Sequence, residues 1–182
     1  MESVEPIRDK KKIESMKKYL KSKNVRDYVL FSLGINSGLR ISDLLNLTVE
    51  DVKGKDRIAI REQKTGKTKN FPLSEKSKEI IASYIKQGEL DSGYLFPSRK
   101  GSAPISRIQA YRIINDAARY AKVKDNVGTH TMRKTFGYWA YKAGYDIAMI
   151  QKLLNHSAPS VTLRYIGIQQ DELDEVYLNL DL

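Results

Sequence analysis

Apolar side chains recur every three or four residues over most of this chain, which is the spacing of one face of a helix. The pattern predicts helices over Asp9 to about Ser22, about Val25 to Ser37, Ser74 to Gln87, and Ser106 to about Ala121. Three further helical segments are expected around Thr131 to Ala143, Asp146 to Leu154, and Ser160 to Tyr165. A short helix should also begin near Ser42, whose hydroxyl group can cap its first turn.

The segment from Lys53 to Leu73 follows a different period. Ile58 and Ile60 alternate there with charged residues, and the two extended runs are joined by K-T-G-K-T. This pattern predicts a small hairpin or a three-stranded sheet. The chain is therefore expected to fold as one globular domain that is mainly α with a small antiparallel β-sheet, an α+β class.

The charge balance adds a candidate partner. The 182 residues include 32 Lys and Arg against 22 Asp and Glu, a net charge of +10 that would draw the protein to a polyanion. A plain basic surface is the alternative. The chain has no cysteine, which excludes disulfides and thiol chemistry and suits a reducing cytosol. No apolar run reaches transmembrane length and the N-terminus lacks a signal peptide's apolar stretch, so a cytoplasmic location is expected.

Two arginines are candidates for holding a phosphodiester. Attack on a phosphodiester places extra negative charge on its equatorial oxygens, so fixed cations stabilise the transition state. Arginine suits this role because its planar fork donates two hydrogen bonds and stays charged. Arg40 and Arg133 are the candidates, and Asp43, three residues after Arg40, could hold the Arg40 guanidinium in place.

The two histidines of the chain favour proton transfer and phosphate binding over metal binding. His130 lies three residues before Arg133, so one helical face would present both side chains. Two histidines cannot complete a metal site, and no carboxylate stands at the usual ligand spacing from His130 or His156. No metal and no cofactor are expected.

A tyrosine and a lysine complete the candidate set. The Tyr165 phenol, with an ordinary pKa of about 10, needs a base or a positive site to act as a nucleophile. The departing sugar oxygen needs a proton, which a lysine at the tip of the hairpin could supply. Lys64 is the candidate, with Lys67 and Lys69 as rivals.

Four strings in this chain resemble the tyrosine recombinases, also called the phage integrase family. They are G-L-R-I-S-D-L-L at 38–45, Q-K-T-G-K at 63–67, H-T-M-R-K-T-F at 130–136 and L-L-N-H-S-A-P-S-V-T-L-R-Y at 153–165. They stand in the family's order and span almost the whole chain. The resemblance implies the fold of a recombinase catalytic domain. It also implies a site-specific DNA recombinase that works through a 3′-phosphotyrosyl intermediate.

The resemblance also implies a role for each candidate. Arg40 and Arg133 would clamp the scissile phosphate, and Lys64 would protonate the leaving 5′ oxygen. His130 would exchange a proton with the nucleophile, His156 would hydrogen-bond the phosphate, and Tyr165 would attack. Two positions depart from the family: Asp43 stands where glutamate is common, and Asn155 replaces a frequent glycine.

Contacts and assembly on DNA are further expectations. Backbone contacts to double-stranded DNA are expected from five basic residues, Lys67, Lys69, Arg99, Lys100 and Lys134. Residues 1–170 would form the catalytic domain. The tail at 171–182 has five acidic residues and no basic one, and would form a helix that docks on a neighbouring protomer or on its own core. By family analogy the protein would act as a homo-oligomer on DNA, a tetramer in the synapse.

The region before the catalytic motifs is short. About 40 residues precede Arg40, too few for the N-terminal DNA-grasping domain of typical members, so that domain is expected to be absent. The chain would then be either an excised fragment or a short invertase of the fimbrial-switch type.

Two other functions fit parts of the sequence. A type IB topoisomerase would share the tyrosine chemistry but relax supercoils without exchanging partners. A non-catalytic helix-turn-helix module would account for residues 146–165 alone. The second reading leaves Arg40, Lys64 and the His130/Arg133 pair without a role.

Overall fold

The helices predicted before residue 168 and the predicted hairpin are present in a computed structural model, which describes residues 4–99, 103–168 and 178–179. The helices are α1 (Lys10–Lys23), α2 (Val25–Ser37), α3 (Ile41–Leu45), α4 (Val49–Val52), α5 (Glu75–Gln87), α6 (Arg107–Tyr120), α7 (Thr131–Lys142), α8 (Ile147–Leu154) and α9 (Pro159–Ile166). Strands β1 (Arg57–Arg61) and β2 (Thr68–Pro72) pair antiparallel. The predicted class is therefore confirmed, with a two-stranded hairpin rather than a three-stranded sheet in the described residues.

Local chemistry at the helix ends explains most of the boundaries. Asp9 caps α1 by accepting a hydrogen bond from the Lys11 backbone, and Asn24 caps α2 in the same way. Gly38 ends α2 in the left-handed conformation, with φ of 60°, which a residue without Cβ adopts at no steric cost. The chain then turns directly into α3.

One predicted cap is wrong. The residue that precedes α3 is Arg40, which makes no side-chain cap, and Ser42 lies inside the helix. The left-handed turn at Gly38 starts the helix earlier than the serine signal suggested. As a result, the Arg40 side chain projects from the first residue before α3.

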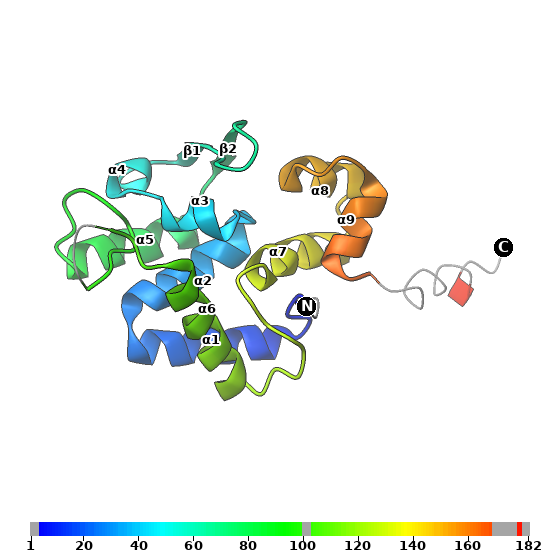
Figure 1. Cartoon of the computed structure of the whole chain (residues 1–182), viewed down its shortest axis with the longest axis horizontal. Helices are drawn as coiled ribbons and strands as arrows, with labels where there is room; N and C mark the ends of the chain where they lie inside the picture. Colours follow the sequence, from blue (N-terminus) through cyan, green and yellow to red (C-terminus); the bar gives the residue numbers. More distant parts are fainter. Residues whose placement is uncertain (1–3, 100–102, 169–177, 180–182) are drawn as a thin grey trace.

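The core divides into two clusters of buried side chains. The larger cluster is built around α2, which is contacted by α1, α5 and α7 and buries Val29, Leu30 and Phe31. The smaller cluster joins α7, α8 and α9 through Ile150, Leu154 and other buried side chains. We call α1 to α6 with the hairpin the large lobe, and α7 to α9 the small lobe (Figure 1).

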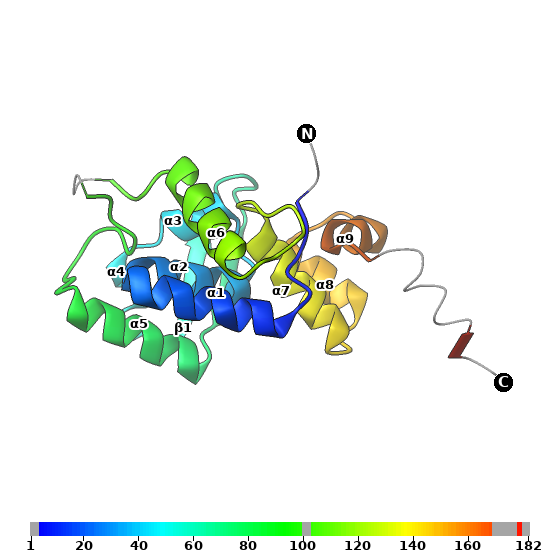
Figure 2. The same ribbon diagram turned by 90° about the horizontal axis from the view of Figure 1, so that it is seen from below.

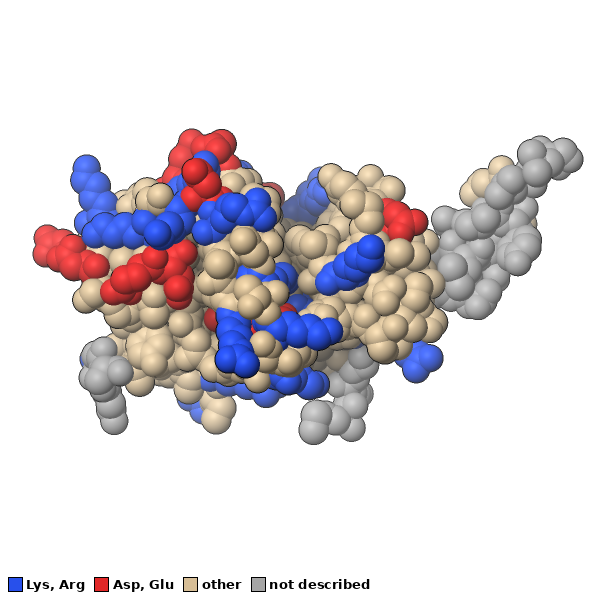
Figure 3. Space-filling model, turned by 90° about the horizontal axis from the view of Figure 1, so that it is seen from above, with Lys and Arg blue, Asp and Glu red and all other residues tan. Residues whose placement is uncertain are grey.

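The lobes are arranged so that the hairpin and the loop joining α8 to α9 stand on the same side of the molecule (Figure 1). On the opposite side, α1 crosses the large lobe beside α6 (Figure 2). Seen from the hairpin side, the surface is hollowed between the lobes, and basic side chains gather in this hollow (Figure 3). The candidate residues come from elements that border it.

Several expectations fall outside the described residues. They are the acidic tail, of which only residues 178 and 179 are described, and Lys100. None of the helices in the described part of the chain combines the length and the apolar character needed to cross a bilayer.

Two helical glycines give a test of this packing: Gly137 lies within the small lobe, and Gly34 lies where α2 meets α7. A Cβ at Gly137 would lie 2.7 Å from Cγ2 of Ile166, a branched side chain with little freedom to move. We expect Gly137→Ala to destabilise the protein by about 1–2 kcal/mol despite its better helix propensity. A Cβ at Gly34 would instead meet the flexible end of Met132, so Gly34→Ala should change the free energy of unfolding less. Urea unfolding measures both, and equal effects would contradict this packing.

Candidate active site

Arg133 places a deeply buried positive charge at the border between the lobes. Its side chain extends from the first turn of α7 and is 2% exposed. Nη1 donates to the carbonyl oxygen of Gly38, and Nη2 donates to the carbonyl oxygen of Leu154. Burial lowers the pKa of Arg133, yet a guanidinium remains charged at any working pH. Arg133 therefore fixes a positive charge where the end of α2 and the end of α8 meet α7.

Arg40 supplies a second cation from the start of α3. Its Nη1 atom forms an ion pair of 2.7 Å with Oε1 of Glu62, a carboxylate that is 1% exposed. Oε2 of Glu62 accepts hydrogen bonds from Thr65 Oγ1 at 2.7 Å and from Asn155 Nδ2 at 2.9 Å. Burial raises the pKa of Glu62, but these hydrogen bonds and the Arg40 charge outweigh it and lower the pKa to about 2. The carboxylate is thus ionised at neutral pH.

The expected partner of Arg40 was different. Asp43 is buried in α3, but its Oδ1 atom accepts a hydrogen bond from the Gln63 backbone at 2.9 Å. Asp43 therefore holds the hairpin backbone. Glu62, not Asp43, is the carboxylate that pairs with Arg40. Nothing in the sequence pattern singled out Glu62, because a charged residue at the end of an alternating strand normally faces solvent.

His156 lies directly after α8 and faces the proposed nucleophile. Its Nδ1 atom is 3.1 Å from Oγ1 of Thr162, and its ring centroid is 4.8 Å from that of Tyr165. Burial, followed by the charges of Arg133 and Arg40, lowers the pKa of His156 to about 4. The imidazole is therefore neutral at neutral pH, with one N–H donor and one acceptor nitrogen whose assignment depends on the tautomer.

The hydroxyl oxygen of Tyr165 is shielded from solvent. Burial raises the pKa of Tyr165, while the charges of Arg133 and Arg40 oppose this shift. The phenol is therefore protonated in the protein as described. Any attack by its oxygen requires that the proton be removed as the new bond forms.

His130 occupies the outer edge of the site. It caps α7 without a side-chain hydrogen bond, is exposed, and has Nε2 3.4 Å from Nη2 of Arg107. Although the residue as a whole is exposed, partial burial of its ring, then the charges of Arg107 and Arg133, lower the pKa of His130. Arg107 begins α6 and was not identified in the sequence, where an arginine at a helix start carries no distinguishing signal.

The three candidate lysines of the hairpin differ in depth. Lys64 and Lys67 are exposed in the turn between the strands. Lys69 is half-buried on β2, and its Nζ atom donates to the carbonyl oxygen of Ser37 at 3.3 Å. Burial and the charge of Arg133 lower the pKa of Lys69 to about 8. Geometry thus leaves the proton donor open: Lys64 and Lys67 could move toward a bound strand, whereas Lys69 is already close to the arginines.

The structure changes one expected DNA contact. Lys134 is 7% exposed, and its Nζ atom lies 5.2 Å from the centroid of the Tyr165 ring. The side chain packs against the tyrosine ring and burial lowers its pKa, so the DNA contact expected of Lys134 stays a prediction. Arg99 is exposed in the loop before α6, as its predicted contact requires.

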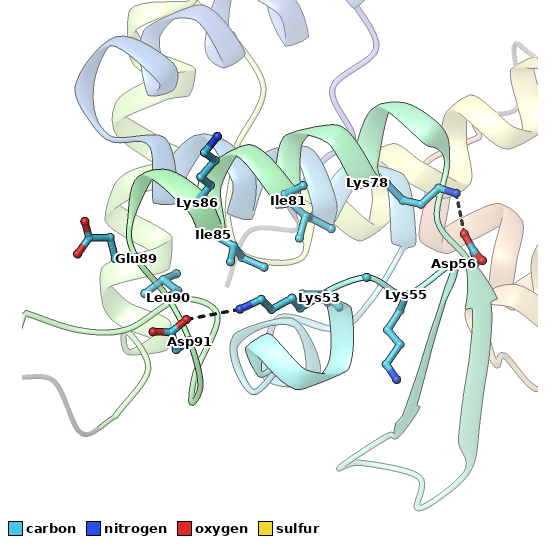
Figure 4. Close-up of a pocket in the computed structure, with 13 residues that line it drawn as sticks. Lys53, Lys55, Asp56, Lys78, Ile81, Ile85, Lys86, Glu89, Leu90 and Asp91 are labelled. Carbon is cyan, nitrogen blue, oxygen red and sulfur yellow. Dashed lines mark hydrogen bonds and ion pairs between the residues drawn. The ribbon is translucent and has the colours of Figure 1, made fainter.

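A separate cavity of about 770 Å³ lies between α5 and the segment that joins α4 to β1 (Figure 4). Its wall includes apolar side chains of α5 such as Ile81. Lys53 pairs with Asp91 at 3.5 Å, and Lys78 pairs with Asp56 at 2.8 Å. These pairs leave little net charge, and none of the six candidate residues lines the cavity. The candidate residues therefore lie outside this cavity.

The charges of Arg40 and Arg133 both act on His156 and Tyr165, whose rings are in contact, so these four side chains lie close together. Two fixed cations, a neutral imidazole and a buried phenol define a site for phosphotyrosyl transfer. Within the described residues, no group of three or more His, Cys, Asp or Glu side chains is placed to hold a metal ion.

Comparisons with known proteins agree with this class. The model of the phage integrase family matches residues 8–172, so the chain belongs to the phage integrase family. A probable integrase/recombinase of Bacillus subtilis, YoeC, is 49% identical over 97% of both chains. The tyrosine recombinase XerC of Thermodesulfovibrio yellowstonii is 32% identical over 84% of this chain, which spans 53% of that relative. The predictions of the family and of a DNA strand transferase are confirmed.

The fold also has a solved counterpart. It matches the XerH site-specific recombinase, crystallised with its palindromic difH substrate, at a TM-score of 0.76 and 20% identity. The match covers 92% of this chain and 49% of XerH. At this identity the likeness establishes the fold, and the prediction of a recombinase catalytic-domain fold is confirmed.

The ionisation of His156 gives a direct test of the site's electrostatics. The folded pKa of about 4 lies below the ordinary value of about 6.5, so folding favours the neutral ring. Below about pH 6.5 the unfolded state binds a proton on this ring that the folded state does not. The contribution of His156 to the free energy of unfolding is therefore complete above pH 6.5 and is lost as the pH falls through about 4. In the His130→Asn variant, which retains one histidine, we expect the NMR signals of that ring to titrate near pH 4. A midpoint at or above 6.5 would contradict the described environment.

Proposed function

We propose that this chain is a site-specific recombinase that cuts one strand of double-stranded DNA with Tyr165 and rejoins it to another strand. The observation that carries this proposal is the meeting of Arg40, Arg133, His156 and Tyr165 in a basic hollow. The arginines would neutralise the non-bridging oxygens of a single phosphate, and His156 would donate a hydrogen bond to the same group.

The chemistry balances with side chains alone. The Tyr165 oxygen attacks phosphorus, and this attack forms the P–O bond to tyrosine. The proton of the phenol passes to His130 at the same time. The bond from phosphorus to the 5′ oxygen breaks, and that oxygen takes a proton from Lys64. The product is a 3′-phosphotyrosyl link and a free 5′ hydroxyl. Attack by the 5′ hydroxyl of another strand reverses these steps and conserves the bond energy.

Arg133 can serve this role while it keeps its structural contacts. Its two described hydrogen bonds to Gly38 and Leu154 use two of the five N–H groups of a guanidinium. The remaining donors would be available to a phosphate. A DNA strand would then bind to an arginine whose position is already fixed by both lobes.

DNA binding and assembly are parts of the same proposal. The basic side chains in the hollow (Figure 3) and the net charge of +10 support a DNA backbone across this face, with contacts from Lys67, Lys69, Arg99 and Lys100. We expect protomers to associate on DNA as a tetramer, with the acidic tail on a neighbouring protomer. The expected place of action is the nucleoid.

Covalent trapping tests the proposed nucleophile. The probe is a duplex carrying the site that the protein selects from random-sequence DNA, nicked so that the cut fragment diffuses away. Wild-type protein should form a denaturation-resistant adduct with this duplex. Tyr165→Phe should form none and should retain DNA affinity within about threefold, because only the reacting oxygen is lost. A wild-type protein that binds the site without an adduct would refute the catalytic proposal and favour a binding module.

A supercoiled plasmid without the selected site separates the topoisomerase alternative. The proposed recombinase should leave such a plasmid supercoiled at protein concentrations that trap its own site completely. Efficient relaxation by wild-type protein, absent in Tyr165→Phe, would assign the tyrosine chemistry to relaxation instead.

A sulfur leaving group identifies the lysine that donates the proton. When a 5′-bridging phosphorothiolate replaces the scissile phosphodiester, the thiolate leaves without protonation. We expect Lys64→Ala to slow cleavage of the ordinary substrate by about 100-fold or more and to cleave the sulfur substrate at nearly the wild-type rate. Lys67→Ala and Lys69→Ala should show no such selective rescue. Rescue of Lys69→Ala instead would move the proton donor from the turn to β2.

A further inference from the structure

A buried carboxylate stands inside a site that is built to bind an anion. Glu62 is 1% exposed and ionised, and it pairs with Arg40, one of the two arginines proposed to hold the phosphate. A buried carboxylate destabilises the folded state unless each of its hydrogen-bond and ion-pair partners is in place. Glu62 has three such partners, and they come from three different parts of the chain.

The first connection made by Glu62 is to the turn that carries Lys64. Thr65 in this turn donates its hydroxyl to Oε2 of Glu62 at 2.7 Å. The backbone of Glu62 also hydrogen-bonds with Gly66 and Lys67, at 2.8 and 2.9 Å. Glu62 therefore closes the turn from both its side chain and its backbone.

The second connection crosses to the small lobe through Asn155. The Nδ2 atom of Asn155 donates to Oε2 of Glu62 at 2.9 Å, and its Oδ1 atom accepts from Nζ of Lys67 at 3.3 Å. Asn155 ends α8 in the left-handed conformation, with φ of 53°, and is followed directly by His156. One side chain thus joins the lysine turn to the segment that leads into α9 and Tyr165.

We propose that Glu62 and Asn155 form a latch that holds the Lys64 turn against the α8–α9 segment. The latch aligns the donor of the leaving-group proton with the nucleophile. Both are positioning residues: Asn155 acts through the turn, and Glu62 acts through the turn and through Arg40. The inference rests on the proposed function, since it concerns the same reaction.

The latch explains two features that are otherwise unrelated. Asn155 stands where glycine is common in the family, and a glycine would leave Oε2 of Glu62 without this donor. Asn155 also keeps a backbone conformation in which asparagine is tolerated but glycine is preferred. Its side-chain contacts provide a physical reason for that choice.

The test compares Asn155→Gly with wild type on the two nicked substrates. Glycine fits the left-handed backbone, so the variant should fold with a melting temperature close to that of wild type. We expect single-turnover cleavage of the ordinary substrate to fall by about 10- to 100-fold, because a displaced proton donor acts poorly. Cleavage of the 5′-phosphorothiolate should stay within about twofold of wild type, since its sulfur needs no proton.

Two further variants complete the design. Glu89→Gly is the control, because Glu89 has φ of 48° and is exposed at the end of α5, outside the site. It should leave both cleavage rates unchanged. Glu62→Gln removes the charge that pairs with Arg40, so it should slow cleavage of both substrates, and the sulfur substrate should recover only part of the loss.

The outcomes distinguish the latch from the reaction itself. If wild-type protein forms the adduct but Asn155→Gly matches it on both substrates, the latch is wrong and the proposed function stands. An equal loss on both substrates would also overturn the latch, because it would place the effect elsewhere than on the leaving group. Absence of an adduct in wild type would overturn both.

Discussion

The burial of one positive charge, the Arg133 guanidinium, is the constraint on which the rest of this structure depends. The Arg133 guanidinium is almost fully buried and is held by backbone carbonyls from two distant parts of the chain, Gly38 and Leu154. A buried guanidinium without such acceptors would be strongly destabilising. The same contacts that make its burial possible also join the lobes, so the position of this charge and the packing of the domain have one cause.

The other ionisable side chains of the site are governed first by burial and then by this charge. Burial and the Arg133 charge together keep His156 neutral and lower the pKa of Lys69 to about 8, whereas burial raises the pKa of Tyr165 and the Arg133 charge opposes that shift. The buried carboxylate of Glu62 pairs with Arg40 and accepts a hydrogen bond from Thr65 in the hairpin turn. An incoming phosphate would therefore meet charges whose positions were set during folding. Charges that are already in place stabilise a transition state without any rearrangement of the protein during the reaction.

The sequence predicted the elements that follow simple periodicity or a clear cap. The helices with strong apolar stripes and the alternating strands were all identified, and four motifs located the candidate residues and the family. The short helix α4, capped by Thr48 and Asp51, was not predicted, because four residues are too few to show a period.

The partners of the site residues could not be predicted from the sequence either. Glu62, Arg107 and Thr162 contribute through contacts with residues far away in the chain or on a neighbouring turn, and the contact of Lys134 with the Tyr165 ring was not foreseen either. Residue type and spacing do not encode such pairings.

The central claim is that Arg40 and Arg133 neutralise the charge of one scissile phosphate. A methylphosphonate at that position carries a methyl group in place of one charged oxygen, so it needs less neutralisation. Arg40→Ala should lose about 100-fold or more in single-turnover cleavage of the phosphodiester. On the methylphosphonate, the same variant should come within about tenfold of wild type. An equal loss on both substrates would contradict the claim, because it would show that Arg40 does not act on the phosphate charge.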